Sequence, residues 1–382
     1  MNYRAIVYFI GLFIFPISFL SFVNILYSIY FDYFLSIDGY VFTLIASSVV
    51  GVTLILFGKN ATKKLNFYEQ LILIISVYLI CAFFISLPYY LSIYQITFIN
   101  ALFESFSGIT STGFTIFNNI KYLDPTLILW RSSSQWIGGF YFLVFLIIIF
   151  TNKQYNFKLS HLSYTGNNGS FSSENIKKQL IQLLLIYSLL SLLIFILLNL
   201  GEVRLFNSLN LSMTIISNGG FLPGNSLTQI IKGKNNVYLI ICLFISMLNV
   251  FFFFNLFSKR KIFSYHQEDL ALIIFISFLS IITTFVVSSY GYGEVIINIL
   301  SSIANSGITT SSNVGNMGLF FVILTLIGGS VVSNTSGIKF LRIYILFKNT
   351  AAEILKLVRP NNVFNNSIFY SDKKLDNQTI NL

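Results

Sequence analysis

Long apolar segments alternate with short polar stretches along most of this chain. Several apolar segments are at least as long as the roughly 20 residues that an α-helix needs to cross a bilayer. They cover residues 5–30, 71–94, 180–200 and 270–290. After each of the last three comes an amphipathic piece of about 10 residues, too short to cross, then a polar patch and another apolar segment. The pattern predicts pairs of membrane-spanning helices with a polar segment inside each pair.

The three polar patches are rich in Gly, Ser, Thr and Asn and occupy residues 107–115, 217–224 and 305–312. Irregular backbone at membrane depth occurs only where it is buried in protein or lines a water-filled cavity. Filters that bind cations through backbone carbonyls are built from such segments. The sequence therefore predicts an all-α polytopic membrane protein that carries a cation pathway.

The expected architecture is an accessory N-terminal helix hairpin followed by three helix–pore loop–helix repeats. The hairpin has spans at 5–30 and 40–57 and contains no polar patch. The helices expected in the repeats are 71–91, 98–107 and 124–150; 180–200, 206–216 and 237–257; and 269–290, 294–304 and 317–347. The domain boundaries are 1–66 for the hairpin, 67–155 for repeat 1, 156–262 for a cytoplasmic loop and repeat 2, 263–359 for repeat 3, and 360–382 for a cytoplasmic tail.

Composition and charge placement fit a membrane protein, with 55% hydrophobic and 9% charged residues. Soluble domains carry about 25% charged residues, so a water-soluble globule is excluded. The net charge of +10 comes mainly from basic clusters that follow every second span, as the positive-inside rule requires of cytoplasmic loops. These clusters are Lys59, Lys63 and Lys64; Lys153, Lys158, Lys177 and Lys178; Lys259, Arg260 and Lys261; and Lys348, Lys356 and Arg359. We expect a cytoplasmic N-terminus, polar patches that enter from outside, and no nucleic-acid partner.

Enzymatic chemistry has no basis in the sequence motifs. There is no Ser/His/Asp or Cys/His set, Walker loop or dinucleotide fingerprint. Cys81 and Cys242 both lie in apolar spans, so no disulfide is expected. We interpret His161 and His266, near predicted cytoplasmic ends, as solvated loop residues rather than metal ligands. The sequence predicts no enzymatic activity and no cofactor bound by this chain.

The polar patches supply the candidate filter residues. A cation that sheds its water needs several oxygens at fixed distance, which backbone carbonyls provide. Consecutive carbonyls point inward only with unusual dihedral angles, which glycine adopts most easily. The candidate filter residues are Gly113, Gly220 and Gly307, with Thr112, Gly219 and Ser306 before them. Candidate supporting residues are Thr110, Ser111, Asn218 and Asn305. The alternative, ordinary external turns, does not explain three patches that each follow a short amphipathic helix.

Two charged residues near the first patch have more than one possible role. Glu104 lies on the first short helix, where it would either raise the local cation concentration or hydrogen-bond the backbone that supports the filter. We favour the supporting role. Arg131 begins the returning helix, where it would snorkel to the membrane surface or act as a structural anchor. Because Gln135 and two tryptophans flank Arg131, we favour the anchor.

The third returning segment carries a contiguous polar run in its middle, G-G-S-V-V-S-N-T-S-G at 328–337, followed by Lys339. Gly and Ser/Thr clusters lower helix propensity and offer hydrogen bonds that compete with the helix. Small residues also allow close helix packing, which is the alternative interpretation. The length of the run favours a broken helix with a loop inside the membrane.

The first repeat resembles one family, the bacterial TrkH-type potassium transporters of the Trk/Ktr/HKT superfamily. F-E-S-F-S-G-I-T-S-T-G-F-T at 103–115 is similar to the start of that family's first pore repeat. L-W-R at 129–131 and Q-W-I-G-G at 135–139 continue the resemblance into the returning helix. The resemblance implies a potassium-channel-like pore.

The rest of the chain resembles the same family. Residues 217–221 and 306–310 are similar to its second and third filters, and the two leading spans resemble the hairpin that separates the TrkH type from the KtrB type. The segment 328–339 resembles its gating loop. The residues to which the resemblance gives a gating role are Gly328, Gly329, Ser333, Asn334, Thr335, Ser336, Gly337 and Lys339.

This resemblance implies a function and partners. It implies potassium uptake across the bacterial inner membrane by a homodimer in the lipid bilayer, with potassium as the substrate. It also implies a TrkA-like nucleotide-binding cytoplasmic subunit that controls the gate. Glycine at the filter position is associated in this family with potassium preference over sodium.

The sequence departs from the family in two ways and leaves alternatives open. The family has four pore repeats, whereas the pattern here ends after the third, so we expect either a fragment or a pore completed by a partner chain. The gating loop also has fewer glycines than usual, with Val331 and Val332 inside it. The alternative function is a non-conducting membrane subunit. An inverted-repeat secondary transporter is disfavoured because all three patches enter from one side, and the residues leave channel-like and ion-coupled transport equally open.

Overall fold

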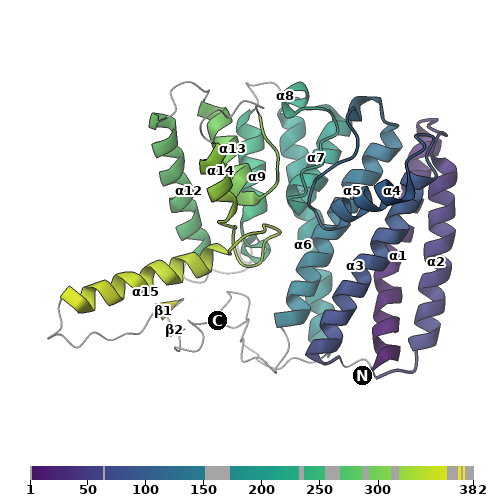
Figure 1. Cartoon of the computed structure of the whole chain (residues 1–382), viewed down its shortest axis with the longest axis horizontal. Helices are drawn as coiled ribbons and strands as arrows, with labels where there is room; N and C mark the ends of the chain where they lie inside the picture. Colours follow the sequence, from purple (N-terminus) through teal and green to yellow (C-terminus); the bar gives the residue numbers. More distant parts are fainter. Residues whose placement is uncertain are drawn as a thin grey trace.

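The computed structural model is an array of long helices that run side by side, with shorter helices packed among them (Figure 1). It describes residues 2–62, 65–150, 173–231, 236–253, 267–286, 292–310, 318–358, 369–370 and 373–374. Several sequence-based expectations lie outside the described residues: the loop at 151–172, most of the tail at 360–382, both histidines, the end of the third patch, and the basic residues at 63–64, 153–158 and 259–261.

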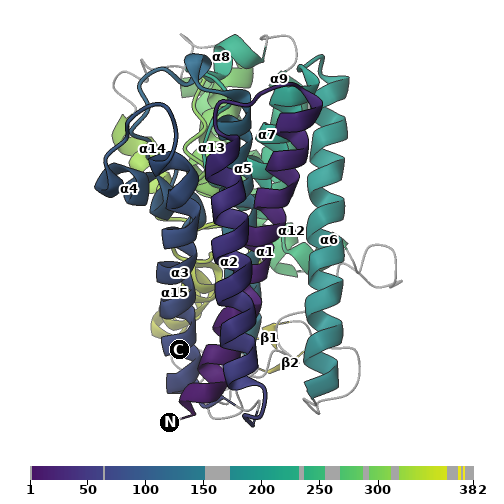
Figure 2. The ribbon, with the colours of Figure 1, turned by 90° about the vertical axis from the view of Figure 1, so that its right-hand side faces the viewer.

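The N-terminal hairpin consists of α1 (Tyr3–Tyr30) and α2 (Ile37–Gly58), close to the two spans expected for it (Figure 2). At Gly11 the α2 backbone passes so close that a side chain on this residue would collide with it. Ser18 and Ser47 add a hydroxyl–hydroxyl hydrogen bond of 2.7 Å across the same interface. Small residues therefore let the two helices approach closely, which is the usual basis of packing between membrane helices.

Repeat 1 follows the hairpin. Its elements are α3 (Phe67–Tyr90), α4 (Phe98–Ile109), the 3₁₀ turn η1 (Ile120–Tyr122) and α5 (Pro125–Phe150). A capping box begins α3, because the Glu69 carboxylate accepts a hydrogen bond of 2.8 Å from the backbone N–H of Asn66. The Thr97 hydroxyl accepts from the backbone N–H of Asn100 at the start of α4. These caps fix where the two helices begin.

Repeat 2 consists of α6 (Ser173–Leu200), α7 (Leu205–Ser217), α8 (Leu227–Ile230) and α9 (Asn236–Met247). The continuous returning helix expected at 237–257 is wrong, because α9 ends at Met247 and a new helical stretch begins at Val250. Asn249 causes the restart: its side-chain oxygen accepts a hydrogen bond of 3.0 Å from the backbone N–H of Phe251. Asparagine in this position caps a helix rather than continuing one.

Repeat 3 contains a second interrupted helix. Its elements are α12 (Gln267–Val286), α13 (Tyr292–Ala304), α14 (Gly318–Thr325) and α15 (Phe340–Val358). Residues 326–339, which we call the interrupting segment, are not helical and separate α14 from α15. The structure therefore has a break here rather than a continuous small-residue packing face. After the break α15 runs sideways, away from the other helices (Figure 1).

The described part of the chain is almost entirely helical. Its strands are β1 (Phe369–Tyr370) and β2 (Lys373–Lys374), which form one short antiparallel pair. Five helices in the described residues are long and apolar enough to cross a membrane: α1, α2, α3, α5 and α6. Two buried apolar clusters fill the interior, one joining the hairpin to repeat 1 and the other joining repeats 2 and 3. Because α5 contributes to both clusters, it holds the two halves together.

Candidate functional site

The three short helices α4, α7 and α13 end in the same backbone motif. One residue near each helix end, Ser111, Asn218 or Asn305, adopts a left-handed conformation with φ of 53°, 53° and 56°. Its backbone N–H bonds three residues back, and the next N–H bonds five residues back, with N···O distances between 2.9 and 3.1 Å. This is the Schellman motif that ends helices. Three different sequences therefore turn the chain in the same way.

A glycine with positive φ follows each motif after one further residue. Gly113, Gly220 and Gly307 have φ of 85°, 78° and 65°. A residue with a side chain adopts this region only with strain, which costs roughly 1–2 kcal/mol. The three candidate filter glycines thus share one conformation that favours glycine.

The residue pairs 112–113, 219–220 and 306–307, which we call the glycine segments, lie next to each other in chain order. A side chain on Gly113 would collide with the backbone carbonyl of Gly219, and one on Gly220 would collide with that of Ser306. A side chain on Gly307 would meet none of the described atoms within 4 Å. Segments about 100 residues apart in sequence therefore form part of a ring, whose open side in the described structure is next to Gly307.

Each left-handed residue is held by the returning helix of its own repeat. The Ser111 hydroxyl donates to the Gln135 carbonyl on α5 at 3.5 Å. The Asn218 side-chain oxygen accepts from Ser246 on α9 at 2.9 Å, and the Asn305 amide donates to the Thr325 carbonyl at the end of α14 at 3.0 Å. In repeat 1 the hydroxyls of Thr110 and Thr112 also bond each other at 2.7 Å. The candidate supporting residues thus connect the helix ends to the surrounding helices.

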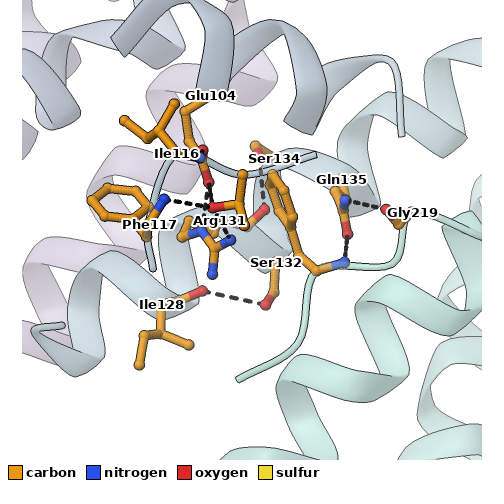
Figure 3. Close-up of polar contacts among 11 residues, drawn as sticks. Glu104, Ile116, Phe117, Ile128, Arg131, Ser132, Ser134, Gln135 and Gly219 are labelled. Atoms are coloured by element: carbon orange, nitrogen blue, oxygen red, sulfur yellow. Dashed lines mark hydrogen bonds and ion pairs between the residues drawn. The ribbon is translucent and has the colours of Figure 1, made fainter. Parts of the chain in front are cut away.

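Glu104 and Arg131 form a buried ion pair between α4 and α5, with 2.8 Å between Oε1 and Nε (Figure 3). The exposed fractions of the two side chains are 0% and 1%. The other carboxylate oxygen of Glu104 accepts from the backbone N–H of Ile116 at 2.9 Å, and Thr115 bonds both charged groups. The guanidinium also lies 4.2 Å from the ring centre of Phe221, in repeat 2. Sequence reasoning did not pair these two charges.

Gln135 connects α5 to the second glycine segment (Figure 3). Its Nε2 donates to the Gly219 carbonyl at 2.6 Å, and its Oε1 accepts from the backbone N–H of Phe221 at 3.1 Å. A side chain on Gly219 would collide with this amide. Only glycine fits at position 219, because the Gln135 side chain packs directly against it. Sequence reasoning assigned Gln135 no contact of its own, since its partner is 84 residues away.

In repeats 1 and 3, a polar side chain before the candidate filter glycine accepts a hydrogen bond from the backbone N–H three residues after that glycine. Glu104 precedes Gly113 by the same distance in sequence as Asn298 precedes Gly307. Each bonds the backbone N–H three residues after its glycine: Glu104 bonds that of Ile116 at 2.9 Å, and Asn298 bonds that of Thr310 at 3.3 Å. The corresponding residues in repeat 2 are Leu211 and Pro223. Leucine offers no acceptor there, and proline has no N–H that needs one.

The candidate gating residues fold into a compact turn beneath α7. The Lys339 ammonium donates to the carbonyls of Ser333 and Thr335 at 2.9 and 2.6 Å. The Gly329 N–H donates to the Thr335 hydroxyl at 2.8 Å. Asn334 reaches out of the turn and donates from Nδ2 to the Ile216 carbonyl of α7 at 2.8 Å.

The glycines at the two ends of this turn allow close backbone approach. A side chain on Gly328 would collide with the Ser336 carbonyl, and Gly337 has a φ of 79°. Gly328, Gly329, Ser333 and Thr335 are buried, Ser336 and Gly337 are exposed, and Asn334 and Lys339 lie in between. The turn is thus held by internal hydrogen bonds, with one side open.

Metal-binding side chains do not gather in the described residues, where no group of three His, Cys, Asp or Glu is placed to hold a metal ion. Cys81 and Cys242 are buried free thiols. The long apolar helices define the class: an all-α polytopic membrane protein.

Comparisons with known proteins narrow this class. A scan against models of protein families finds no match. The chain is 30% identical over 328 residues to an uncharacterized cation transporter of Methanocaldococcus jannaschii, covering 82% of this chain and 66% of that protein. It is 28% identical over 296 residues to the Trk system potassium uptake protein TrkH of Escherichia coli, covering 71% and 59%.

The fold comparison agrees with the sequence comparison. The crystal structure of the potassium transporter TrkH from Vibrio parahaemolyticus superposes with a TM-score of 0.83 at 22% sequence identity, covering all of this chain and 81% of that one. The chain is thus similar to TrkH-type transporters in sequence and in fold, and the relatives named here are transporters. It spans 66% of the length of the archaeal relative and 59% of the length of the E. coli relative.

Proposed function

We propose that this chain forms most of a potassium uptake pathway across a bacterial inner membrane. Its ion filter would consist of Thr112 and Gly113, Gly219 and Gly220, and Ser306 and Gly307. The observation that carries the proposal is the partial ring of glycine segments, in which each candidate filter glycine with a described neighbour adjoins the carbonyl of the next segment. The E. coli relative is named a potassium uptake protein, which supports potassium as the substrate.

The helix ends supply the electrostatics for such a filter. The C-terminal end of a helix carries a partial negative charge of about half an electron. Here the C-terminal ends of α4, α7 and α13 lead directly into the glycine segments. They would therefore stabilise a cation that has lost part of its water. Glu104 would act as support, because both its oxygens are bonded to the backbone and side chains around the first segment.

The interrupting segment would form the gate of this pathway. It lies under the second glycine segment, since Asn334 bonds the last turn of α7. By family resemblance, a TrkA-like nucleotide-binding subunit would move the gate from the cytoplasmic side, and two copies of the transporter would assemble in the bilayer. This arrangement requires a cytoplasmic N-terminus. Co-purification of such a subunit with the native protein, lost on truncation of the cytoplasmic loops, would support the partner.

Substitution of a filter glycine tests the function. In proteoliposomes that contain the complete native protein, Gly113→Ser should lower the preference for potassium over sodium by roughly tenfold, which corresponds to about 1.4 kcal/mol of lost discrimination between the two ions. The reason is that the spacing of the filter oxygens would change. The added side chain would also displace the Gly219 carbonyl. The readout is the ratio of initial potassium and sodium fluxes.

Gly224→Ala is the matched control for this substitution. Gly224 lies near the second segment, but a side chain there would make only ordinary contacts with Ile230 at 3.5 Å. It should leave the flux ratio unchanged. An active Gly113→Ser protein that keeps its parent's ion preference would contradict the proposed filter.

A further inference from the structure

Two adjacent carboxylates, Glu268 and Asp269, are buried in the first turn of α12, with exposed fractions of 2% and 1%. Buried charges persist only where partners compensate them. The N-terminus of a helix offers part of that compensation to an acidic side chain. The other partners of this pair, which we call the carboxylate clamp, are therefore informative about its role.

The clamp bonds the first half of the interrupting segment. Glu268 Oε1 accepts from the backbone N–H of Val331 at 2.9 Å. Asp269 Oδ1 accepts from the Ser330 hydroxyl. The Phe340 N–H donates to the Gly329 carbonyl at 3.1 Å, which joins this half to the start of α15. The first turn of α12 thus holds one limb of the segment, and that limb holds the other.

The clamp also bonds the break in the second returning helix. Asp269 Oδ1 accepts from the backbone N–H of Asn249 at 3.1 Å. Beside this contact the two interrupted helices bond each other directly: Val250 N–H donates to the Val332 carbonyl at 2.9 Å, and Ser330 N–H donates to the Met247 carbonyl at 3.1 Å. Both breaks therefore meet at the carboxylates of α12.

The turn inside the interrupting segment has hydrogen bonds of its own. Lys339 bonds Ser333 and Thr335, and Gly329 bonds Thr335, all within the segment. Lys339 also interacts electrostatically with Glu268. The segment is therefore a unit with internal hydrogen bonds, attached to its surroundings through Ser330, Val331, Val332 and Asn334.

We propose that Glu268 and Asp269 are positioning residues that hold the interrupting segment under α7. Weakening their hydrogen bonds lets the segment move out as a unit. The carboxyl oxygens are the acceptors for Val331 and Ser330. An amide in their place puts an NH₂ donor where one of the accepting oxygens stands, so the limbs should loosen while the internal turn remains. The role in gating rests on the proposed function, whereas the position of the segment does not.

Repeat 1 provides an internal comparison. Glu69 occupies the first turn of α3 and is also buried, with an exposed fraction of 6%. Its oxygens accept from the backbone N–H groups of Asn66 and Asn2 at 2.8 and 2.6 Å. It thus caps its own helix and the N-terminus, far along the chain from either break. Glu69→Gln is the matched control for Glu268→Gln.

A cysteine inside the segment reports its position. Val332 is buried, with an exposed fraction of 1%, and Val332→Cys keeps a small apolar side chain there. The purified full-length protein would be labelled with a small water-soluble thiol reagent, and the buried native Cys81 and Cys242 give the background. Glu268→Gln should speed labelling of position 332 by roughly five- to tenfold, the size expected for the loss of a hydrogen bond. Asp269→Asn should act in the same direction and serves if Glu268→Gln does not fold.

Three outcomes decide the inference. Faster labelling in the clamp variants, with Glu69→Gln like the parent and similar thermal midpoints throughout, supports it. Unchanged labelling in both clamp variants overturns it, as does faster labelling in Glu69→Gln as well, which would indicate general loosening. Potassium flux in proteoliposomes is measured separately: faster labelling in protein that never conducts potassium would refute the proposed function and leave the clamp intact.

Discussion

At the scale of single residues, each repeat deals in its own way with one backbone N–H group, the one three residues after the candidate filter glycine. The N–H three residues after a filter glycine bonds a carboxylate in repeat 1 and an amide oxygen in repeat 3. In repeat 2 proline removes the donor, and leucine stands where the acceptor would be. A buried N–H without an acceptor costs about 1–3 kcal/mol. The sequence differences between the repeats therefore come in compensating pairs.

The buried ion pair of repeat 1 permits a quantitative test. Arg131→Met should lower the free energy of unfolding by about 3–5 kcal/mol, because it leaves the Glu104 carboxylate charged and buried without its partner. In Glu104→Gln/Arg131→Met the loss should be clearly smaller than the sum of the two single losses. Unfolding by SDS titration in mixed micelles gives all three values.

Arg204→Met is the control for that cycle, since Arg204 is exposed at the start of α7 and should change stability little. Losses that add up in the double variant would show that the two side chains stabilise the protein independently. That result would remove the structural reason for treating Arg131 as an anchor of the first glycine segment.

The sequence predicts some of these residues and not others for a physical reason. The glycines with positive φ stand in polar patches that interrupt apolar segments, which is a local signal. The contact of Gln135 with Gly219 and the pairing of Arg131 with Glu104 cross between helices, and no local pattern marks them. Asn298 could have been found by aligning the three repeats on their glycines, which places it at the position of Glu104.

At the scale of elements, the two interrupted returning helices form one unit. Their breaks exchange backbone hydrogen bonds through Val250 and Ser330. The break in repeat 3 is visible in the sequence because ten consecutive residues have low helix propensity. The break in repeat 2 rests on a single residue, Asn249, in an otherwise apolar stretch. Hydrophobic periodicity alone therefore predicted an unbroken helix there. Most other helices begin and end close to the residues that the apolar pattern predicts.

Asn249→Ala tests whether this side chain sets the break. It removes the acceptor for the Phe251 N–H, so stability should fall by about 1 kcal/mol, the usual cost of losing an N-cap. The measurement is the thermal midpoint of the purified protein. Asn199→Ala, at an exposed position near the end of α6, is the control and should leave the midpoint unchanged. A midpoint that Asn249→Ala leaves unchanged would mean that the backbone bonds to Asp269 and Val332 define the break without the cap.

At the scale of the whole molecule, the ring of glycine segments has an order and an open side. The segment of repeat 1 adjoins that of repeat 2, which adjoins that of repeat 3, and a side chain added to Gly307 would meet no described atom within 4 Å. Polar backbone facing lipid is not tolerated. We therefore propose that a further segment covers the pore beside Gly307; the relatives are longer than the region they share with this chain.

The polypeptide that supplies this segment can be identified from the native protein. An intact mass above 43.4 kDa after purification from its own membrane, with peptides beyond Leu382 that carry another helix, glycine segment and helix, would assign closure of the pore to this polypeptide itself. A mass of 43.4 kDa with a co-purifying chain that carries such a segment would assign closure of the pore to a partner. A mass of 43.4 kDa without such a chain, in protein that conducts no potassium, would contradict the uptake proposal and favour a non-conducting membrane subunit.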